Sequence, residues 1–500
     1  MTGILFLSLD EGFRAISIRY LSSYVKSLGH SSKIIFLCKS IANFNHKNSF
    51  SKKEVKSIVN FIIKNKISFV GMSVMTGRFF EAIKLAGKIK KNLHGVNVIF
   101  GGIHPTICPQ ECLKSGIDYV IVGEGEIPLK KLLANEDKKK ILGLGYMSKG
   151  RIIINPQEKK LIPLDKLPFP DYDFNDSYYL DSGIIKNLSI EVYKKHTPWN
   201  GRYYYLTTTR GCPYNCSYCC NVNKNKLRRS SVDRVIQELR EARRTMPFIC
   251  GVNIQDDSFF MGSDEWLEDF CSKLKKEFNW PFVARIMPRF VNERRIKILK
   301  NGGLEYVSIG LQGSDRLNKE LYKRNETSNS FLKACRILSK YDINFVVDVL
   351  LDNPYETEED LKEVAETLNE AQRPFAVSAY SLTLFPGTGL FEKAKKDSTY
   401  KKFGTDAYNS VFQATIPETY RTPSSWKKLI TAVISQTSKE DISKIIKKGV
   451  INPESIKEID KLYEKYRFNI NFANKIRNFN PNLFNLLLRI YKKIFKLVKE

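Results

Sequence analysis

The sequence has 500 residues, of which 42% are hydrophobic and 12% aromatic. This composition excludes a disordered chain, and the length allows two to four domains with ample buried core. The formal net charge of +28 permits nucleic acid, anionic lipid or acidic small molecules as partners, although a Lys- and Asn-rich proteome from an AT-rich genome also explains it.

The chain shows no uninterrupted apolar run long enough to span a bilayer. Met1 leads directly into the strand-like segment GILFLSL, without the features of a signal peptide. Its ten cysteines are unevenly spaced, which is typical of reduced thiols rather than of a disulfide framework. We therefore expect a cytoplasmic protein.

Residues 1–135 alternate between short apolar runs and amphipathic segments. Such alternation predicts an α/β domain with a doubly wound parallel sheet, similar to a Rossmann fold. The predicted strands are 4–9, 33–37, 67–74, 96–101 and 119–122, and the predicted helices are 16–28, 53–64, 79–91 and 127–134.

Ligands of such sheets bind outside the carboxyl ends of the strands, where glycine, hydroxyl and histidine residues gather in this sequence. This pattern resembles the cobalamin-binding domain found upstream of one branch of radical S-adenosylmethionine (SAM) enzymes. The resemblance implies that Ser73 and Thr76 lie near the nucleotide base of cobalamin. It also implies that Gly101, Gly102 and His104 form the Gly-Gly-x-His-Pro loop of that family. A further glycine-rich segment, GEGE, occupies residues 123–126.

Two observations leave the cofactor of this domain open. After the first strand, residues 10–15 read DEGFRA and lack the cobalt-ligating histidine of the methionine-synthase type. Some relatives keep this fold without the cofactor, and a histidine beside proline, as His104 is, also serves structural roles.

Residues 136–200 form a predicted connector. Three prolines within 161–174 exclude a helix or a central strand there. The segment resembles the connector of cobalamin-type radical SAM proteins. The aromatic-rich residues 175–200 either line a substrate opening or pack as a strap.

A Cys-x3-Cys-x2-Cys segment follows the next predicted strand. Three thiolates in one loop suit an iron–sulfur cluster or zinc, but structural zinc normally takes four protein ligands. The segment resembles that of the radical SAM superfamily, which implies that Cys212, Cys216 and Cys219 hold a 4Fe-4S cluster whose open iron binds SAM. Tyr218 is then a SAM-binding residue. Cys220 is an alternative fourth ligand, although we expect its side chain to point away.

Residues 201–402 alternate again, with predicted strands at 203–208, 251–255, 282–286, 306–310, 345–350 and 375–383. This pattern resembles the partial (β/α)6 barrel of radical SAM enzymes, in which chemistry lies at the carboxyl ends of the strands. The resemblance implies that Asp256 and Asp257 face the methionine amine of SAM. Arg285 then faces its carboxylate, and Gln312 its ribose.

The segment after the fifth barrel strand departs from this family. Relatives read Gly-x-Pro-Gly-Glu-Thr there, whereas Asp352 and Tyr355 replace both glycines. We therefore expect a different backbone shape at the end of this strand.

Residues 403–500 form a predicted basic helical region, with 18 Lys or Arg against seven Asp or Glu in 421–500. The segment 482–499 is amphipathic, and its apolar face either packs on the barrel or lies on an anionic membrane. The second alternative favours a lipid substrate and peripheral membrane contact.

The resemblance implies reductive cleavage of SAM to a 5′-deoxyadenosyl radical, with electrons from a flavodoxin or ferredoxin type donor. Cobalamin-dependent methylation of an unactivated carbon of a small molecule or lipid is the leading hypothesis. The alternatives are a radical SAM cyclase or oxidoreductase, a tRNA methylthiotransferase and a non-enzymatic sensor. The methylthiotransferase, and with it nucleic acid, is disfavoured because Cys38, Cys108 and Cys112 are poorly spaced for a second cluster. The substrate and any catalytic side chain are not encoded in a motif.

Overall fold

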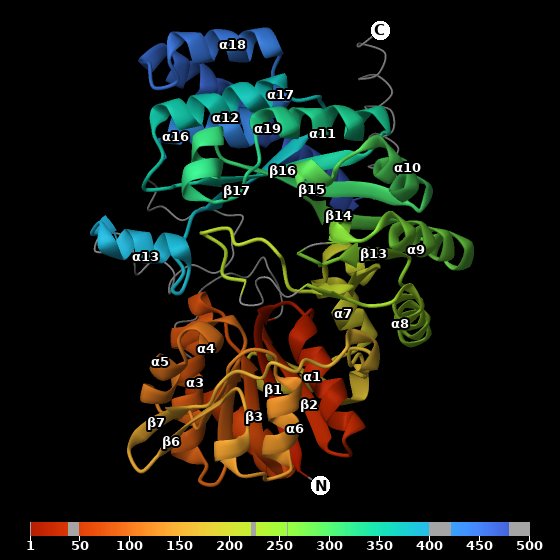
Figure 1. Cartoon of the computed structure of the whole chain (residues 1–500), viewed down its shortest axis with the longest axis vertical. Helices are drawn as coiled ribbons and strands as arrows, with labels where there is room; N and C mark the ends of the chain where they lie inside the picture. The colour runs from red at the N-terminus through yellow and green to blue at the C-terminus, as the bar shows by residue number, and fades with distance from the viewer. Residues whose placement is uncertain (1, 39–49, 222–226, 258, 400–421, 480–500) are drawn as a thin grey trace. The chain divides into compact units, whose positions relative to one another are not determined.

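The computed structural model describes residues 2–38, 50–221, 227–257, 259–399 and 422–479 (Figure 1). The chain forms two compact units. The first comprises 1–308, 319–325 and 383–413, and the second comprises 309–318, 326–382 and 414–500. No helix within the described ranges is long and apolar enough to cross a membrane. The amphipathic segment predicted at 482–499 lies outside the described residues.

The first unit is built around a nine-stranded sheet with the order β7-β6-β5-β4-β3-β1-β2-β8-β9. Strands β1 to β5 are parallel, which confirms the doubly wound fold. The order of the strands along the sheet reverses between β1 and β3, the position at which ligands bind to such sheets. The five parallel strands are β1 (Gly3–Glu11), β2 (Ser31–Cys38), β3 (Ile67–Ser73), β4 (Asn97–Gly101) and β5 (Tyr119–Ile121).

The helices of this domain are α1 (Ile16–Ser27), α2 (Lys52–Lys64), α3 (Phe79–Asn92), α4 (Ile103–Ile107), α5 (Pro109–Lys114) and α6 (Glu126–Leu133). Side chains alternate between the two faces of a strand. On β1, Leu5 and Leu7 therefore join the apolar core with α2 and α3. Ile4 and Phe6 face the other side, where a pocket lies.

The connector contains more regular structure than its sequence predicts. Two hairpins extend the sheet at its edges. One is β6 (Leu144–Ser148) with β7 (Arg151–Ile154), and the other is β8 (Ser177–Asp181) with β9 (Ile184–Asn187). The short helix α7 (Ile190–His196) follows them. No strand or α-helix forms at 161–174, where the prolines stand; this stretch, which the structure describes in full, contains a 3-10 turn at Leu164–Lys166 and the start of another at Phe174–Asp176.

The six predicted barrel strands form one sheet with the order β10-β13-β14-β15-β16-β17. They are β10 (Tyr203–Leu206), β13 (Gly251–Ile254), β14 (Phe282–Ile286), β15 (Leu304–Gln312), β16 (Asn344–Leu351) and β17 (Ala376–Ser381). Parallel pairing joins β10 to β13, β13 to β14 and β16 to β17. A sheet in sequence order with parallel pairs agrees with the α/β repeat that we predicted.

A polar residue begins each helix that follows these strands, and its side chain accepts a hydrogen bond from a backbone N–H of the first turn. These caps fix where each strand-to-helix loop ends. The helices and their caps are α8 (Val232–Thr245, Ser231), α9 (Asp264–Glu277, Ser263), α10 (Glu293–Asn301, Asn292), α11 (Ser328–Lys340, Thr327), α12 (Glu358–Glu370, Thr357) and α13 (Gly389–Lys396, Thr388).

The described part of the C-terminal region is helical, as predicted. It contains α16 (Ser424–Lys428), α17 (Ile434–Gln436), α18 (Lys439–Lys448) and α19 (Pro453–Phe479). Helix α18 packs on α12, and Asn369 of α12 donates a hydrogen bond to the carbonyl oxygen of Lys439 at 3.0 Å. These helices belong to the second unit.

Candidate functional site: a cofactor pocket and a cysteine loop

A pocket of about 390 Å³ lies at the strand ends of the nine-stranded sheet. Its lining is mainly apolar and includes Ile4 and Phe6 of β1 together with residues of α1 and α6. Thr207, Arg210 and Gln255 from the barrel part of the same unit also line it. Residues of the sheet domain and residues next to the cysteine segment therefore line the same pocket.

Three of the residues predicted to bind cobalamin line this pocket: Ser73, Gly101 and Gly102. Gly102 has a φ of 97°, and a Cβ atom there lies 2.9 Å from the hydroxyl oxygen of Ser73, so only glycine fits. At Gly101 the nearest atom to a Cβ is 4.0 Å away. The bare backbone at these positions leaves space for a flat heterocycle, such as the nucleotide base of cobalamin, and the binding of cobalamin by Ser73, Gly101 and Gly102 stays a prediction.

The other two predicted cobalamin residues, Thr76 and His104, are buried but do not belong to the pocket lining. Nδ1 of His104 lies 3.3 Å from the hydroxyl oxygen of Thr76, and its ring packs on Phe79. Burial lowers the pKa of His104 to about 4, so the imidazole is neutral at pH 7. No histidine is among the described residues that line the pocket, in agreement with the DEGFRA sequence. Cobalamin binding by Thr76 and His104 stays a prediction.

The three cysteines of the Cys-x3-Cys-x2-Cys segment lie in a loop closed by a two-stranded hairpin. Strand β11 (Thr209–Arg210) pairs antiparallel with β12 (Arg228–Arg229) at the base of this loop. Two backbone hydrogen bonds fix the middle of the loop at Ser217. The N–H of Ser217 donates to the carbonyl oxygen of Tyr322 at 2.9 Å, and the carbonyl oxygen of Ser217 accepts from the N–H of Leu390 at 2.8 Å. The loop is therefore held by segments far away in the sequence.

The donor set of this loop fits a cluster better than a single ion. Two thiolates on one zinc ion can be at most about 4.6 Å apart, because each Zn–S bond is about 2.3 Å. Among the described residues, the three cysteines do not form a group with all ligand atoms within 4.8 Å of one another. In a cubane cluster each thiolate binds a different iron. Three thiol donors in one loop therefore suit a 4Fe-4S cluster, and its binding by Cys212, Cys216 and Cys219 stays a prediction.

Burial governs the chemistry of these thiols. Cys216 is only 7% exposed, and desolvation raises its pKa, while the nearby charge of Arg324 lowers it. Desolvation also raises the pKa of Cys219 to about 12. Buried thiols of this kind lose their protons on binding a metal. The backbone N–H of Asn221 donates a hydrogen bond to Sγ of Cys219 at 3.4 Å.

An ion-pair network that the sequence analysis missed ties the base of the cysteine loop to the GEGE segment. Arg210 lies 3.1 Å from a carboxylate oxygen of Glu124 and 2.8 Å from one of Glu126. Arg228, the hairpin partner of Arg210, also pairs with Glu124. The four side chains are at most 21% exposed, so this network is shielded from solvent and holds the hairpin against the sheet domain.

The predicted SAM-binding residues of the first unit fall into two groups. The buried carboxylate of Asp256 accepts hydrogen bonds from the N–H groups of Thr208 and Thr209 and from the hydroxyl of Thr208. Burial nevertheless raises its pKa to about 6. Asp256 therefore organises the backbone that leads into the cysteine loop.

Asp257 lies nearer the loop itself, and Arg285 is close enough to Asp257 for its charge to act on that carboxylate. The amide of Asn221 donates to Asp257 at 2.8 Å, just after the last cysteines. Desolvation raises the pKa of Asp257, and the charge of Arg285 partly offsets this. Tyr218 packs edge-on against Tyr322, with ring centroids 5.0 Å apart, and its hydroxyl accepts from Arg324 at 3.4 Å. Their binding of SAM stays a prediction, as does that of Asp256.

Gln312 ends β15 in the second unit. It has a left-handed φ of 68°, which is uncommon for a residue other than glycine. Strained backbone of this kind clusters at functional sites. The role of Gln312 at the ribose of SAM stays a prediction that this strain supports.

Asp352, which replaces the first family glycine, is also left-handed, with a φ of 60°. Its carboxylate lies 2.6 Å from Nζ of Lys427, and the two side chains are 5% and 9% exposed. It also accepts hydrogen bonds from the hydroxyl of Ser381 and from the N–H of Thr422. Asp352, which stands where the family has glycine, therefore fixes α16 to the end of β16.

We expect Asp352→Gly to destabilise the protein by about 2 kcal/mol. Glycine removes the strain of the left-handed backbone, which raises the free energy of unfolding by about 1 kcal/mol. Removing one partner of a buried ion pair lowers it by about 3 kcal/mol. Thermal unfolding at pH 7 measures the difference. Lys149→Gly is the control because it relieves a φ of 46° at an exposed turn without breaking such a pair. Equal stability of the two variants contradicts the prediction.

Glu356 makes the stability of the protein depend on pH. Desolvation, helped by the charge of Asp352, raises its pKa from 4.5 to about 7. Because the folded state holds the proton more tightly, the stability contributed by Glu356 is lost as pH rises through about 7. We expect Glu356→Gln to be more stable than wild type by about 2 kcal/mol at pH 8 and nearly equal at pH 5. Urea unfolding at both pH values tests this, and a difference that grows toward acid pH contradicts it.

Comparison with known protein families agrees with this geometry. The model of the radical SAM superfamily matches residues 206–368, and that of the B12 binding domain matches residues 5–133. An uncharacterized methyltransferase from Pyrococcus horikoshii is 27% identical, over 67% of this chain and 71% of its own. The anaerobic magnesium-protoporphyrin IX monomethyl ester cyclase of Rubrivivax gelatinosus is 23% identical, over 79% of this chain and 68% of its own.

A solved structure shares the fold. It is the radical SAM methyltransferase TsrM from Kitasatospora setae with cobalamin and a [4Fe-4S] cluster bound, which matches with a TM-score of 0.63 and 16% identity. The match covers 79% of this chain and 75% of that one. The matched B12 region contains most residues of the pocket lining, and the matched radical SAM region contains the cysteine loop. The chain therefore contains one region that matches the radical SAM superfamily and another that matches the B12 binding domain.

Proposed function

We propose that the protein is a cobalamin-dependent radical SAM methyltransferase that acts on an unactivated carbon of a small molecule. One observation carries this proposal. The pocket of the sheet domain is lined in part by Thr207 and Arg210, which immediately precede the cysteine loop in the sequence. A cofactor in the pocket and a cluster on the loop are thereby held by one connected part of the first unit.

The cluster and SAM supply a carbon-centred radical when bound, and cobalamin supplies a methyl group. The protein positions these groups and excludes water. The hairpin of the cysteine loop is fixed by Arg210 and Arg228 on Glu124, and the strand before it is fixed by Asp256. The apolar side chains of the pocket exclude solvent from the face of the cofactor that they cover.

Product analysis under anaerobic, reducing conditions tests the proposal. Methyl donation converts SAM to S-adenosylhomocysteine, whereas reductive cleavage converts SAM to 5′-deoxyadenosine and methionine. We expect protein loaded with cobalamin to form both nucleoside products, and protein without cobalamin to form 5′-deoxyadenosine alone. The electron donor in the cell, which we propose to be of the flavodoxin or ferredoxin type, is replaced in this assay by a chemical reductant.

A second candidate is a radical SAM cyclase or oxidoreductase without methyl transfer. The similarity to the magnesium-protoporphyrin IX monomethyl ester cyclase over 79% of the chain favours it. The same assay separates the two functions. Formation of 5′-deoxyadenosine without S-adenosylhomocysteine in cobalamin-loaded protein supports the cyclase and contradicts the methyltransferase.

A further inference from the structure

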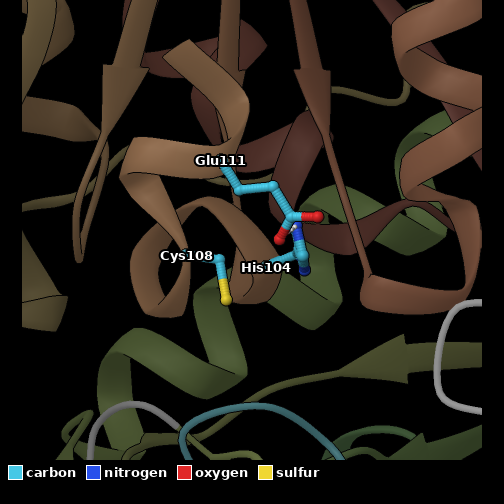
Figure 2. Close-up of side chains that lie close together, drawn as sticks. All are labelled: His104, Cys108 and Glu111. Carbon is cyan, nitrogen blue, oxygen red and sulfur yellow. Dashed lines mark ion pairs between the residues drawn. The ribbon is translucent and has the colours of Figure 1, made fainter. Parts of the chain in front are cut away.

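His104, Cys108 and Glu111 bring three different metal-binding atoms together, and none of these residues lines the pocket or belongs to the cysteine loop. A ring nitrogen of His104, Sγ of Cys108 and a carboxylate oxygen of Glu111 all lie within 4.8 Å of one another. Figure 2 shows the Glu111 carboxylate beside the His104 ring, with the Cys108 sulfur nearby. It is the only such group among the described residues. We propose that these three side chains form a binding site for a zinc-type divalent cation.

The local backbone produces this arrangement. His104 lies in α4 and Glu111 in α5, and Cys108 stands between the two short helices. The N–H of Cys108 donates to the carbonyl oxygen of His104 at 2.7 Å, as in one helical turn. Spacings of four and then three residues keep side chains on one face of a helix. Pro109 begins α5 directly after Cys108, and the three ligands stay on the same side across the junction.

Contacts with Phe79 and Thr76 fix the position of the His104 ring. It is fully buried and packs on Phe79 with ring centroids 4.2 Å apart. Its Nδ1 lies 3.3 Å from the hydroxyl of Thr76. Metal-binding histidines commonly use their second ring nitrogen in such a contact, which fixes the ring orientation. Here this contact directs Nε2 toward Glu111.

The distance between His104 and Glu111 fits a tetrahedral ion. Nε2 of His104 and Oε2 of Glu111 are 3.6 Å apart, which is too far for a hydrogen bond. With metal–ligand bonds of about 2.0–2.3 Å, two ligands of one tetrahedral zinc ion lie about 3.3–3.8 Å apart. The pair therefore already has the required separation, and Cys108 needs to approach by at most about 1.5 Å.

The donor set also selects the class of metal. One imidazole, one thiolate and one carboxylate match the ligands of zinc, whereas magnesium and calcium prefer oxygen ligands alone. Three protein ligands leave a fourth position for water. A bound ion fixes α4, whose Thr106 lines the cofactor pocket and accepts a hydrogen bond from the N–H of Gly123 at 3.1 Å.

Zinc counting on the protein with its iron–sulfur cluster intact tests the proposal. The chain is incubated anaerobically with zinc chloride, passed over a desalting column, and analysed for zinc and iron together. We expect about one zinc beside about four irons per chain. Cys108→Ala should retain almost no zinc, and Glu111→Gln should bind it at least about tenfold more weakly. Cys250→Ala is the control, because Cys250 is a half-buried cysteine outside the group.

X-ray absorption at the zinc edge identifies the ligands. The proposal requires one sulfur at about 2.3 Å and otherwise nitrogen or oxygen ligands. Three sulfur ligands would instead report zinc in the cysteine loop and overturn the proposal. It is also overturned if the chain retains its irons but no zinc, or if Cys108→Ala retains as much zinc as Cys250→Ala.

Discussion

Replacement of Cys216 by alanine is expected to abolish SAM cleavage. Cys216 is the most buried of the three loop cysteines, and its loss leaves two thiolates for a cluster that needs three. Without a stable cluster the electron that cleaves SAM has no path, so the rate should fall at least about a thousandfold, equivalent to about 4 kcal/mol in the barrier. Release of 5′-deoxyadenosine under reducing conditions measures the rate.

Cys250→Ala provides the matched control for Cys216→Ala. The sulfur of Cys250 accepts a hydrogen bond from Nε of Arg202 at 3.2 Å, at a partly exposed position outside the cysteine loop. This variant should keep its iron, its visible absorbance and its rate. Circular dichroism of both variants separates a lost cluster from a lost fold. A Cys216→Ala protein that keeps about four irons and cleaves SAM at the wild-type rate contradicts the assignment of the loop.

Replacement of Gly101 by leucine is expected to prevent cobalamin binding. Gly101 lines the pocket, and a Cβ there meets no protein atom closer than 4.0 Å, so the new side chain can extend into the space of the cofactor. Displacing a ligand by a fixed side chain costs an amount similar to overpacking a core. The dissociation constant should rise at least about 100-fold, or about 2.7 kcal/mol. Equilibrium binding followed by cobalamin absorbance measures it.

Gly87→Leu is the control for Gly101→Leu. Gly87 lies on the exposed side of α3, and nothing stands within 4 Å of a Cβ at this position. The substitution adds the same side chain and should leave cobalamin affinity unchanged. Both variants keep the cysteine loop, so the iron content should be that of wild type. Equal cobalamin affinity of the two variants would show that the ligand does not occupy this pocket.

The regular parts of the fold could be predicted because their signals are local. Strands such as β1 and β3 are continuous apolar runs, which is what burial on both faces of a parallel sheet requires. The hairpins of the connector could not be predicted in the same way. Strands such as β9, Ile184–Asn187, are short and mostly exposed, so their sequences lack a clear alternation. Only pairing with the sheet edge makes them strands.

The candidate site was predictable where a motif names its residues and unpredictable where residues meet through the fold. The cysteine spacing identified the loop directly. The network of Arg210 with Glu124 and Glu126 joins residues 84 to 86 positions apart, and no local pattern signals it. Likewise, the sequence showed Asp352 as a departure from the family, but only the fold reveals its buried partner Lys427.

The cobalt and iron content of one anaerobically purified sample, from cells supplied with cobalamin, decides whether the chain holds cobalamin together with an iron–sulfur cluster. About one cobalt and about four irons per chain are expected, as one cobalamin and one cubane cluster give. Four irons without cobalt, even after incubation with excess cobalamin, would contradict the assignment of the pocket and the proposed methyl transfer.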